Sequence, residues 1–229
     1  MGFRYMNHKI RKANHTDIDR LAVSLARAFD DDPFISWLVR KDKMKQYRME
    51  RLFHVCISEL CLKYEKVFTT EDFTGVTLWY PPGTSEISFA SQLLLAGKMI
   101  PVVGFTGLFP LAMALDNMSK KHPPKKYYYL QFIGVVPEHQ GKGQGASLMK
   151  PILDICDNEH CGAYLECSKE TNIDFYKRFG FRVVEKFFPH KKSPPLWLMW
   201  RNPNKPSSFV APKEKGDLDN EIHTVFFYA

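Results

Sequence analysis

Apolar positions along the chain recur with two different periods, and these periods predict an alternation of helices and strands. In residues 18–29 and 44–64 they fall three or four apart, which is typical of an amphipathic helix that packs on a core. Short runs rich in β-branched and aromatic residues predict strands instead. The predicted strands lie at about residues 9–13, 67–70, 75–80, 127–136, 163–167, 181–188 and 196–200.

Shorter helices and turns complete the pattern. Thr16 is a candidate cap for the helix at 18–29, and the turn before Pro33 ends that helix. Further helices are predicted at residues 34–39, 147–156 and 173–179. Gly180 closes the last of these, because glycine readily takes the left-handed conformation that often follows a helix.

These elements predict an α/β (α+β) domain over residues 1–201, built on a mixed, mostly antiparallel sheet of six or seven strands. Residues 202–229 are expected to form a linker and a tail, with an apolar segment at 225–228 for docking. Residues 99–115 carry no charge and approach the length of a membrane span. Their two prolines and two glycines are predicted to break the stretch twice, which favours two short helices packed on the core.

Composition favours one intracellular enzyme domain. The chain has 229 residues, 45% of them hydrophobic and 25% charged, which is enough for one sizeable core. Lys and Arg give a net charge of +7 but are spread along the chain, so we expect a solvated basic surface, with no nucleic acid and no membrane as partner. The five cysteines lack a Cys-x-x-Cys pair, and the first residues lack a leader-like segment. We therefore expect reduced thiols, a cytoplasmic location and no metal site.

A glycine-rich run between the strand at 127–136 and the helix at 147–156 is the most informative motif. Its glycines let the backbone turn tightly with N–H groups pointing inward, and the N-terminus of the next helix carries partial positive charge. Both features favour a bound phosphate, so the run predicts a cradle for a pyrophosphate. Its candidate cofactor-binding residues are Gln140, Gly141, Lys142, Gly143, Gln144, Gly145 and Ala146.

Other phosphate loops differ from this run in their spacing. A Walker loop needs a glycine where Val136 stands and a hydroxyl where Gly143 stands. A Rossmann fingerprint fits Gly141, Gly143 and Ala146, with Glu166 as the ribose-binding acid, but its turn would be too long and too little chain follows. A glycine-rich surface turn without a ligand is the remaining alternative.

Two segments in the expected order carry a family resemblance. The first is residues 132–145, Phe-Ile-Gly-Val-Val-Pro-Glu-His-Gln-Gly-Lys-Gly-Gln-Gly. The second joins residues 165–168, Leu-Glu-Cys-Ser, to residues 172–181, Asn-Ile-Asp-Phe-Tyr-Lys-Arg-Phe-Gly-Phe. Together they resemble the GNAT superfamily of acetyl-CoA-dependent N-acetyltransferases, and most closely puromycin N-acetyltransferase. The likeness is strong over residues 125–184 and looser over residues 9–80.

The resemblance implies a GNAT fold, in which the parallel strands at 127–136 and 163–167 splay apart at the centre of the sheet. The gap would admit the pantetheine arm of acetyl-CoA, the expected cofactor, which leaves as CoA. Backbone groups at Ile133, Gly134 and Val135 would pair with this arm. Asn172 matches a family position that hydrogen-bonds the arm, and capping of the next helix is its alternative role.

Tyr176 matches the tyrosine that acts in many such enzymes as general acid beside the cofactor sulfur. A phenol with an ordinary pKa of about 10 is protonated at neutral pH, so it can donate a proton to the departing thiolate. Its alternative role is purely structural, as part of the buried face of a short helix with Phe175 and Phe179.

Two carboxylates are candidates for the general base. Asp32 lies in a segment that resembles the place where insect arylalkylamine acetyltransferases carry a glutamate base, and an ordinary acidic turn is its alternative. Glu166 ends a buried strand beside the expected gap, where desolvation raises a carboxyl pKa, and structural pairing with a basic residue is its alternative. Tyr129 and Gln131 stand where vertebrate aralkylamine acetyltransferases carry two histidines, so a base acting through water is expected.

The expected reaction is direct attack by a primary amine of a small molecule in a ternary complex. Residues 105–113 are expected to wall an apolar acceptor pocket opposite the turn at 34–37, and an aromatic amine with one cationic end would suit it. A protein or peptide acceptor and a non-catalytic acetyl-CoA-binding module are the alternatives. We expect a monomer or a homodimer. The candidate substrate residues are Asp31, Phe34, Trp37, Tyr129 and Gln131.

Overall fold

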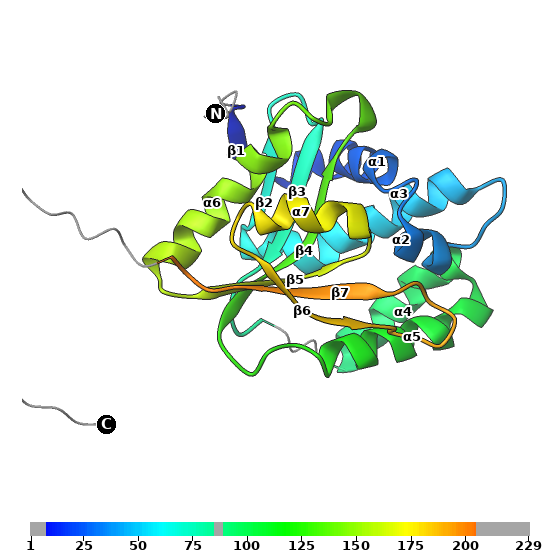
Figure 1. The fold of residues 1–229 in the computed structure, drawn as a ribbon. Helices are drawn as coiled ribbons and strands as arrows, with labels where there is room; N and C mark the ends of the chain where they lie inside the picture. Colours follow the sequence, from blue (N-terminus) through cyan, green and yellow to red (C-terminus); the bar gives the residue numbers. More distant parts are fainter. Residues whose placement is uncertain (1–7, 85–88, 205–229) are drawn as a thin grey trace, which may run out of the picture.

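The computed structural model describes residues 8–84 and 89–204, and within them seven strands form one sheet. Their order across the sheet is β1-β2-β3-β4-β5-β7-β6 (Figure 1). β4 and β5 run parallel, and the other neighbours pair antiparallel, which confirms the predicted mixed sheet. The strands are β1 (Ile10–Lys12), β2 (Val67–Thr70), β3 (Gly75–Tyr80), β4 (Tyr127–Val135), β5 (Gly162–Cys167), β6 (Arg182–Phe187) and β7 (Leu196–Arg201).

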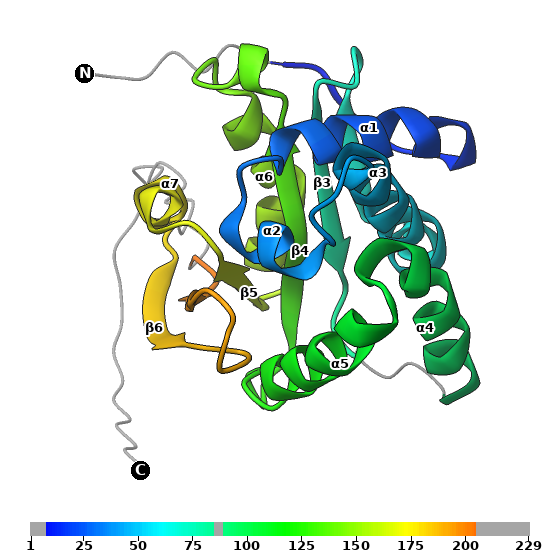
Figure 2. The same cartoon turned by 90° about the vertical axis from the view of Figure 1, so that its right-hand side faces the viewer.

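Helices cover both faces of this sheet. They are α1 (Ile18–Ala28), α2 (Pro33–Leu38), α3 (Lys45–Val55), α4 (Phe89–Val103), α5 (Phe105–Ser119), α6 (Gln144–Asn158) and α7 (Ile173–Lys177). α1 packs on β3 and β4 from one face, with α3 behind it, and α6 packs on the same strands from the other face. Viewed from the side, α2 lies over the middle of β4, and α5 lies below it (Figure 2).

The parallel pair separates halfway along β4. Tyr127 to Leu130 pair with Gly162 to Leu165, and the pairing stops there. Beyond this point β4 continues along β3 as far as Val135, whereas β5 continues along β7 as far as Cys167. The two strands thus part between their carboxyl-terminal halves, as the family resemblance implies.

A β-bulge in β4 lies at the point where the strands part. Leu78 of β3 faces Phe132 and the next residue, Trp79, faces Leu130, so Gln131 is the extra residue of the bulge. A bulge bends its strand and increases the local twist. Gln131 therefore marks the bend that turns the end of β4 away from β5.

Three clusters of buried side chains hold the layers together. The largest lies between the sheet and α1 and α3, and the second lies between the sheet and α6 and α7. The third, which we call the β5–β7 cluster, lies on the same side of the sheet as α2. It consists of Tyr164, Phe187, Leu196 and Leu198, with Phe34, Met118, Tyr127, Tyr129 and Trp200 packed against them.

Several predicted boundaries need correction. Thr16 does not cap α1: it lies in a 3-10 turn, His15–Asp17, that Asn14 caps, and the residue at the N-cap position of α1 is Asp17. The helix predicted at 44–64 is α-helical only to Val55 and continues as a π-helix, Cys56–Cys61, and a 3-10 turn. The spacing of apolar residues does not reveal the change from an α-helix to a π-helix, because the same side of the helix is buried in both parts. α6 begins at Gln144, so the last residues of the glycine run are its first turn.

The apolar stretch after residue 88 forms two helices, each longer than expected. Pro101 and Pro110 lie inside α4 and α5, so the chain breaks once, at Gly104, and not twice. Gly104 has a φ of 74°, which a residue with a side chain rarely adopts. In the described residues no single helix is long and apolar enough to cross a membrane, and the two halves of this pair meet at a bend of 119°.

The carboxyl-terminal boundary at residues 201 and 202 stays a prediction. β7 ends at Arg201, and Asn204 still bonds through its backbone N–H to Asp157 Oδ1 at 2.8 Å. The predicted apolar docking segment at 225–228 lies outside the described residues. All five cysteines are free and buried.

Candidate active site

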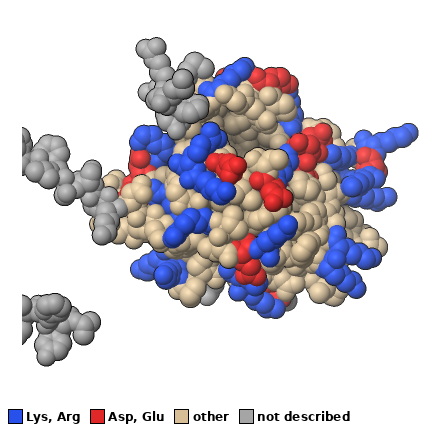
Figure 3. All heavy atoms as spheres, in the orientation of Figure 1, with Lys and Arg blue, Asp and Glu red and all other residues tan. Residues whose placement is uncertain are grey.

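The glycine run forms a tight loop at the N-terminus of α6. Gly141 has a φ of 74° and Gly143 a φ of 86°, and a Cβ atom built on either would meet nothing within 4 Å. The loop thus combines left-handed backbone with open space at the positive end of a four-turn helix, which is a site fit for a phosphate. Figure 3 shows a hollow beside this loop, above α7, with Lys and Arg side chains next to it.

Side chains within the loop hold its shape. Gln140 donates to the Val135 carbonyl at 3.0 Å, and Lys142 donates to the Glu138 carbonyl at 2.8 Å. Gln144 is buried and accepts from the Thr74 hydroxyl at 3.1 Å, so its side chain faces the protein. Of these predicted cofactor residues, Gln144 can serve a ligand only through its backbone.

Gly145 and Ala146 form the next part of the first turn of α6. A Cβ on Gly145 would lie 3.2 Å from the Phe175 ring, so this glycine allows α7 to pack closely against α6. The close packing fixes the position of α7, and therefore of Tyr176, relative to the loop. The predicted cradle and the predicted acid thus belong to one packed unit.

The open edge of β4 lies beside the loop. Ile133, Gly134 and Val135 pair with β3 on one side, and β5 has already turned away on the other. All three are only partly buried, which is unusual for a central strand of a sheet. A Cβ on Gly134 would lie 2.8 Å from the Cβ of Ala28, so α1 packs directly on this part of the strand. Unpaired backbone here can bond an extended ligand such as the pantetheine arm.

Tyr176 lies on α7 and is buried, with its ring against Phe175 and Phe181. Burial raises the pKa of its hydroxyl well above the ordinary value, and the neighbouring Cys167 and Asp32 raise it further. The phenol is therefore protonated at neutral pH and can act only as a donor. Asn172 precedes α7, is exposed, and makes no side-chain cap, so its amide is available to a ligand.

Asp32 is 3% exposed and begins α2. Its Oδ1 accepts the Ile35 backbone N–H at 2.9 Å, and its Oδ2 accepts the Ser168 hydroxyl. Burial raises the pKa of Asp32, although these two hydrogen bonds oppose the rise. Both oxygens are thus already occupied within the protein.

The side chain of Asp31, unlike that of Asp32, faces solvent. It is exposed and pairs with Lys169 at 2.5 Å, and this hydrogen bond lowers the pKa of Asp31. Asp31 and Asp32 together attach the start of α2 to the residues that follow β5.

Glu166 lies on β5 directly after the last residue that pairs with β4. Its side chain is 4% exposed, and Oε1 has no hydrogen-bond partner among the described residues. The Nε2 atom of His122 lies 3.2 Å from this oxygen. The carboxylate is therefore buried and incompletely bonded at the point where the strands part.

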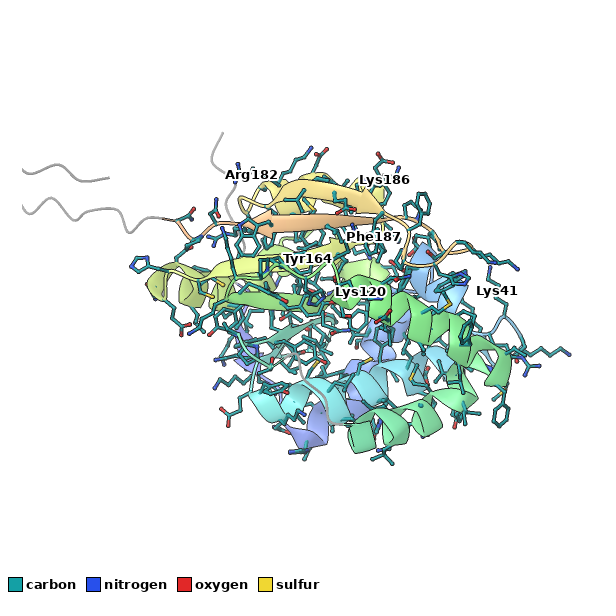
Figure 4. All side chains as sticks on the ribbon, turned by 90° about the horizontal axis from the view of Figure 1, so that it is seen from below. Lys41, Lys120, Tyr164, Arg182, Lys186 and Phe187 are labelled. Carbon is teal, nitrogen blue, oxygen red and sulfur yellow. The ribbon has the colours of Figure 1, made fainter. Side chains whose placement is uncertain are left out.

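Four of the candidate substrate residues lie on α2 or β4. Phe34 and Tyr129 both pack on the β5–β7 cluster, Trp37 stacks near Phe34 at 5.5 Å, and Gln131 occupies the bulge. Seen from below, Tyr164 and Phe187 of this cluster lie near the middle of the molecule (Figure 4).

The expectation that residues 105–113 wall the pocket is wrong for its aromatic members. Phe105 is 77% exposed and Phe109 is 72% exposed, so both face solvent. They do so because the single break at Gly104 makes α5 a continuous helix, whose other side packs on the core. Instead, the later part of α5 reaches the β5–β7 cluster through Met118.

Two residues of this region received no role from the sequence. Ser168 lies inside the resembling segment but carries no signal of its contact with Asp32. His122 lies in a loop of lysines and prolines, where a histidine has no periodicity or motif to distinguish it. Only the fold brings them to the site.

A sheet opened between two parallel strands, with a glycine loop that could hold a phosphate and a buried tyrosine beside the opening, is the arrangement expected of a transferase that uses an acyl-CoA. Residues 54–181, more than half of the chain, match the model of the acetyltransferase (GNAT) family. The chain therefore belongs to this family and is an N-acetyltransferase. Acetyl-CoA is the acyl donor of the family.

Relatives extend this similarity over most of the chain. An uncharacterised N-acetyltransferase of Schizosaccharomyces pombe is 26% identical over 220 residues, which cover 86% of this chain and 84% of the relative. A structure of histone acetyltransferase HPA2 and related acetyltransferase from Corynebacterium glutamicum superposes with a TM-score of 0.66 at 18% identity, covering 88% of this chain and 99% of that one. The mosquito protein arylalkylamine N-acetyltransferase like 5b superposes with a TM-score of 0.53 at 14% identity, covering 85% of this chain and 99% of that one. At these identities the two structures support the fold alone.

Proposed function

We propose that the protein transfers an acetyl group from acetyl-CoA to the primary amine of a small molecule, by direct attack in a ternary complex. The observation that carries this proposal is the covered acceptor side of the opening. The loop between β6 and β7 contacts α2, where His190 lies 5.6 Å from the Trp37 ring, and α5, where Asn117 donates to the Pro189 carbonyl at 2.9 Å. A covered site suits a small acceptor better than a protein surface.

The cofactor would be held by three parts of the chain. Backbone N–H groups of residues 140–146 would bind its pyrophosphate, because the loop is open and lies at the helix N-terminus. The free edge at Ile133, Gly134 and Val135 would bond the pantetheine amides, and Asn172 would contribute its unbonded side chain. Bound acetyl-CoA supplies the thioester whose carbonyl carbon the amine attacks.

The chain itself must move two protons. A protonated amine has to lose one before it can attack, and the departing thiolate has to gain one. Tyr176 is the proposed donor to the thiolate, because its hydroxyl stays protonated in its buried position. The proposed acceptor of the amine proton is a carboxylate, Glu166 or Asp32, because both lie at the opening.

The acceptor we propose is an aromatic or hydrophobic primary amine. Phe34, Trp37 and Tyr129 supply aromatic surface, and Gln131 supplies an amide next to the opening. Asp31 is already paired with Lys169, so it would act on the acceptor only by holding the start of α2 in place. The likeness to puromycin N-acetyltransferase lies in the cofactor segments, so it does not make puromycin the acceptor. We place the enzyme in the cytosol, because its five free thiols suit a reducing compartment.

An acetyl-CoA consumption assay with panels of arylalkylamines, aminoacyl-nucleosides and peptides tests this function. We expect turnover with aromatic amines and none with peptides of similar amine content. Tyr176→Phe serves as the control for background hydrolysis. Turnover restricted to peptides would overturn the small-molecule proposal, and CoA binding without any turnover would favour a binding module.

A further inference from the structure

His122 lies between a buried carboxylate and solvent. It belongs to the loop that joins α5 to β4, and its Nε2 lies 3.2 Å from Glu166 Oε1. Its other ring nitrogen, Nδ1, lies 2.8 Å from the Tyr127 hydroxyl. The side chain of His122 is 21% exposed, whereas that of Glu166 is 4% exposed. One imidazole therefore connects the carboxylate at the opening to the outside of the molecule.

Tyrosine rings hold the imidazole in this place. Its ring centroid lies 5.0 Å from that of Tyr129, 5.1 Å from that of Tyr164 and 5.9 Å from that of Tyr127. Packing on three sides fixes the ring orientation, so the approach of Nε2 to Glu166 is a built feature and not a mobile surface contact.

Two buried polar atoms beside the imidazole make no hydrogen bond of ordinary geometry among the described residues. They are Glu166 Oε1 and the Tyr164 hydroxyl. A buried polar group without a hydrogen bond destabilises the folded state, and such groups persist at sites where a ligand or a reaction uses them. Asp32, the other carboxylate at the opening, has a bond on each oxygen and shows no such deficit.

We propose that Glu166 accepts the proton of the acceptor amine and that His122 passes this proton to solvent. The inference rests on the proposed function and adds to it the choice of base and a second residue that acts through that base. Asp32 is then a positioning residue, which holds α2 against the end of β5.

The proton balance needs no further reactant: the second N–H proton, lost once the C–N bond has formed, replaces the one that Tyr176 gives to the thiolate. An N–H bond of the ammonium breaks and an O–H bond forms on Glu166, leaving a neutral amine. The carboxyl passes the proton to Nε2 of His122 and becomes a carboxylate again. The imidazolium then loses a proton to water, directly or through the Tyr127 hydroxyl. The overall reaction of an ammonium with a thioester releases one proton, and this route carries it.

Among the titratable groups around the His122 imidazole, Glu166 is its main partner. From β4, Tyr127 and Tyr129 face the ring; burial raises the pKa of Tyr127 to about 12 and that of Tyr129 further. From β5, Tyr164 faces it, with a pKa also raised by burial. All three are neutral in the working range. Glu185 of β6 is exposed and paired with Lys121 at 2.5 Å.

Thermal unfolding tests the pair without any assumption about catalysis. His122→Gln, Glu166→Gln and the double variant are compared in the full chain. We expect the Tm changes of the single variants to be clearly non-additive in the double variant, because the residues interact directly. His54→Gln is the matched control, since His54 forms a surface pair with Asp19 at 3.5 Å and should add independently to Glu166→Gln. If the Tm changes of His122→Gln and Glu166→Gln add up in the double variant, the two residues do not interact and the proposal is wrong.

Kinetics with the identified amine tests the proton path. Glu166→Gln should lower kcat/KM by about 10² to 10⁴, and His122→Gln by about tenfold to a hundredfold. His122→Gln should also change the pH dependence of kcat/KM, because it removes the group that passes the proton on to solvent. Added imidazole should restore part of the rate of His122→Ala.

The two proposals fail in different ways. If the parent protein acetylates no amine, the proposed function is wrong, and the unfolding cycle still decides whether the pair exists. If the parent is active but His122→Gln keeps the parental rate and pH profile, the proton path is wrong and the proposed function stands. His54→Gln should leave both unchanged, which separates a specific effect from loss of any histidine.

Discussion

Ser168, the residue that follows β5, donates a hydrogen bond through its hydroxyl to the carboxylate of Asp32 at the start of α2. The bond joins the two elements that border the opening of the sheet on its acceptor side. Because Asp32 also caps α2, the position of Phe34 and Trp37 depends on it. The carboxylate therefore shapes the acceptor site whether or not it takes a proton.

Asp32→Asn is expected to increase stability near neutral pH. Asparagine caps a helix as well as aspartate does and avoids the cost of burying a charge. Burial raises the pKa of Asp32 in the folded protein, so the folded state binds the proton more tightly than the unfolded chain does. As the pH falls through the raised pKa of the folded protein, the parent should therefore gain stability relative to the variant. The gain should be complete below about pH 3.9, the ordinary pKa of an Asp in the unfolded chain.

Chemical denaturation at several values between about pH 4 and pH 8 measures this difference. The advantage of the variant should be largest at the alkaline end and shrink toward the acid end. A difference that does not change with pH would mean that Asp32 is not held as a buried charge. Ser168→Ala provides the comparison, since it should destabilise α2 without removing the titrating group.

Gly143→Asp is expected to abolish CoA binding. The parent should gain about 2.7 kcal/mol in the free energy of unfolding when CoA is present at a hundredfold excess over its dissociation constant. An acidic side chain on Gly143 would enter the open space of the loop and repel the pyrophosphate.

Gly83→Asp is the matched control for this experiment. Gly83 has a φ of 79° and, like Gly143, open space around a built Cβ, but it lies in the turn after β3. Both variants should lose about 1–2 kcal/mol from left-handed backbone. Thermal melts with and without CoA should show a Tm shift for Gly83→Asp only. Equal shifts for both variants would place the phosphate elsewhere.

Tyr176→Phe is expected to lower kcat by about 10² to 10⁴ while the affinity for CoA changes little. The change removes only the hydroxyl, and the ring keeps its packing against Phe175 and Phe181. Tyr128→Phe is the control, because Tyr128 is also buried but its hydroxyl bonds Glu159 at 3.0 Å. Steady-state kinetics of both variants tests whether Tyr176 is the general acid. Full turnover in Tyr176→Phe would assign protonation of the thiolate to another donor.

Much of this architecture could be predicted from the sequence, because it is encoded locally. The apolar periods predicted β2 and β3 at their observed bounds, and the glycine run with its flanking strand and helix predicted the loop before α6. The resemblance supplied the parallel neighbours and their separation. Gly104, by contrast, is one of four helix-breaking residues in its segment, and the sequence alone does not indicate which of them breaks the chain.

The contacts within the site are different, because they join residues far apart in the chain. Ser168 meets Asp32, and His122 meets Glu166, only through strand order and register. A histidine in a loop has the same local sequence whether or not it faces a carboxylate. Exposure of Phe105 and Phe109 likewise depends on which side of α5 the core occupies, which periodicity in an almost wholly apolar helix does not reveal.

Gly134→Ala is expected to destabilise the protein by about 1–3 kcal/mol. A built Cβ lies 2.8 Å from Ala28, 3.0 Å from Leu25 and 3.1 Å from Phe29, so α1 would have to move away from β4. Gly97→Ala in α4 is the control, since a Cβ there meets nothing within 4 Å and should stabilise the helix by about 0.5–1 kcal/mol. Urea denaturation measures both. A Gly134→Ala variant as stable as the parent would contradict the close packing of α1 on the cofactor strand.

Selectivity for aromatic amines is expected to depend on α2 and not on the exposed side of α5. Phe34→Ala and Trp37→Ala should raise KM for an aromatic amine more than for a short aliphatic amine, because each removes aromatic surface next to the opening. Phe109→Ala should change neither KM, since Phe109 is 72% exposed on the far side of its helix. Removing a ring that packs on a substrate should cost about 1–3 kcal/mol, or roughly tenfold to a hundredfold in kcat/KM. If Phe109→Ala impairs the aromatic amine while Trp37→Ala does not, the acceptor lies against α5, and the covered site proposed between α2 and the β5–β7 cluster is wrong.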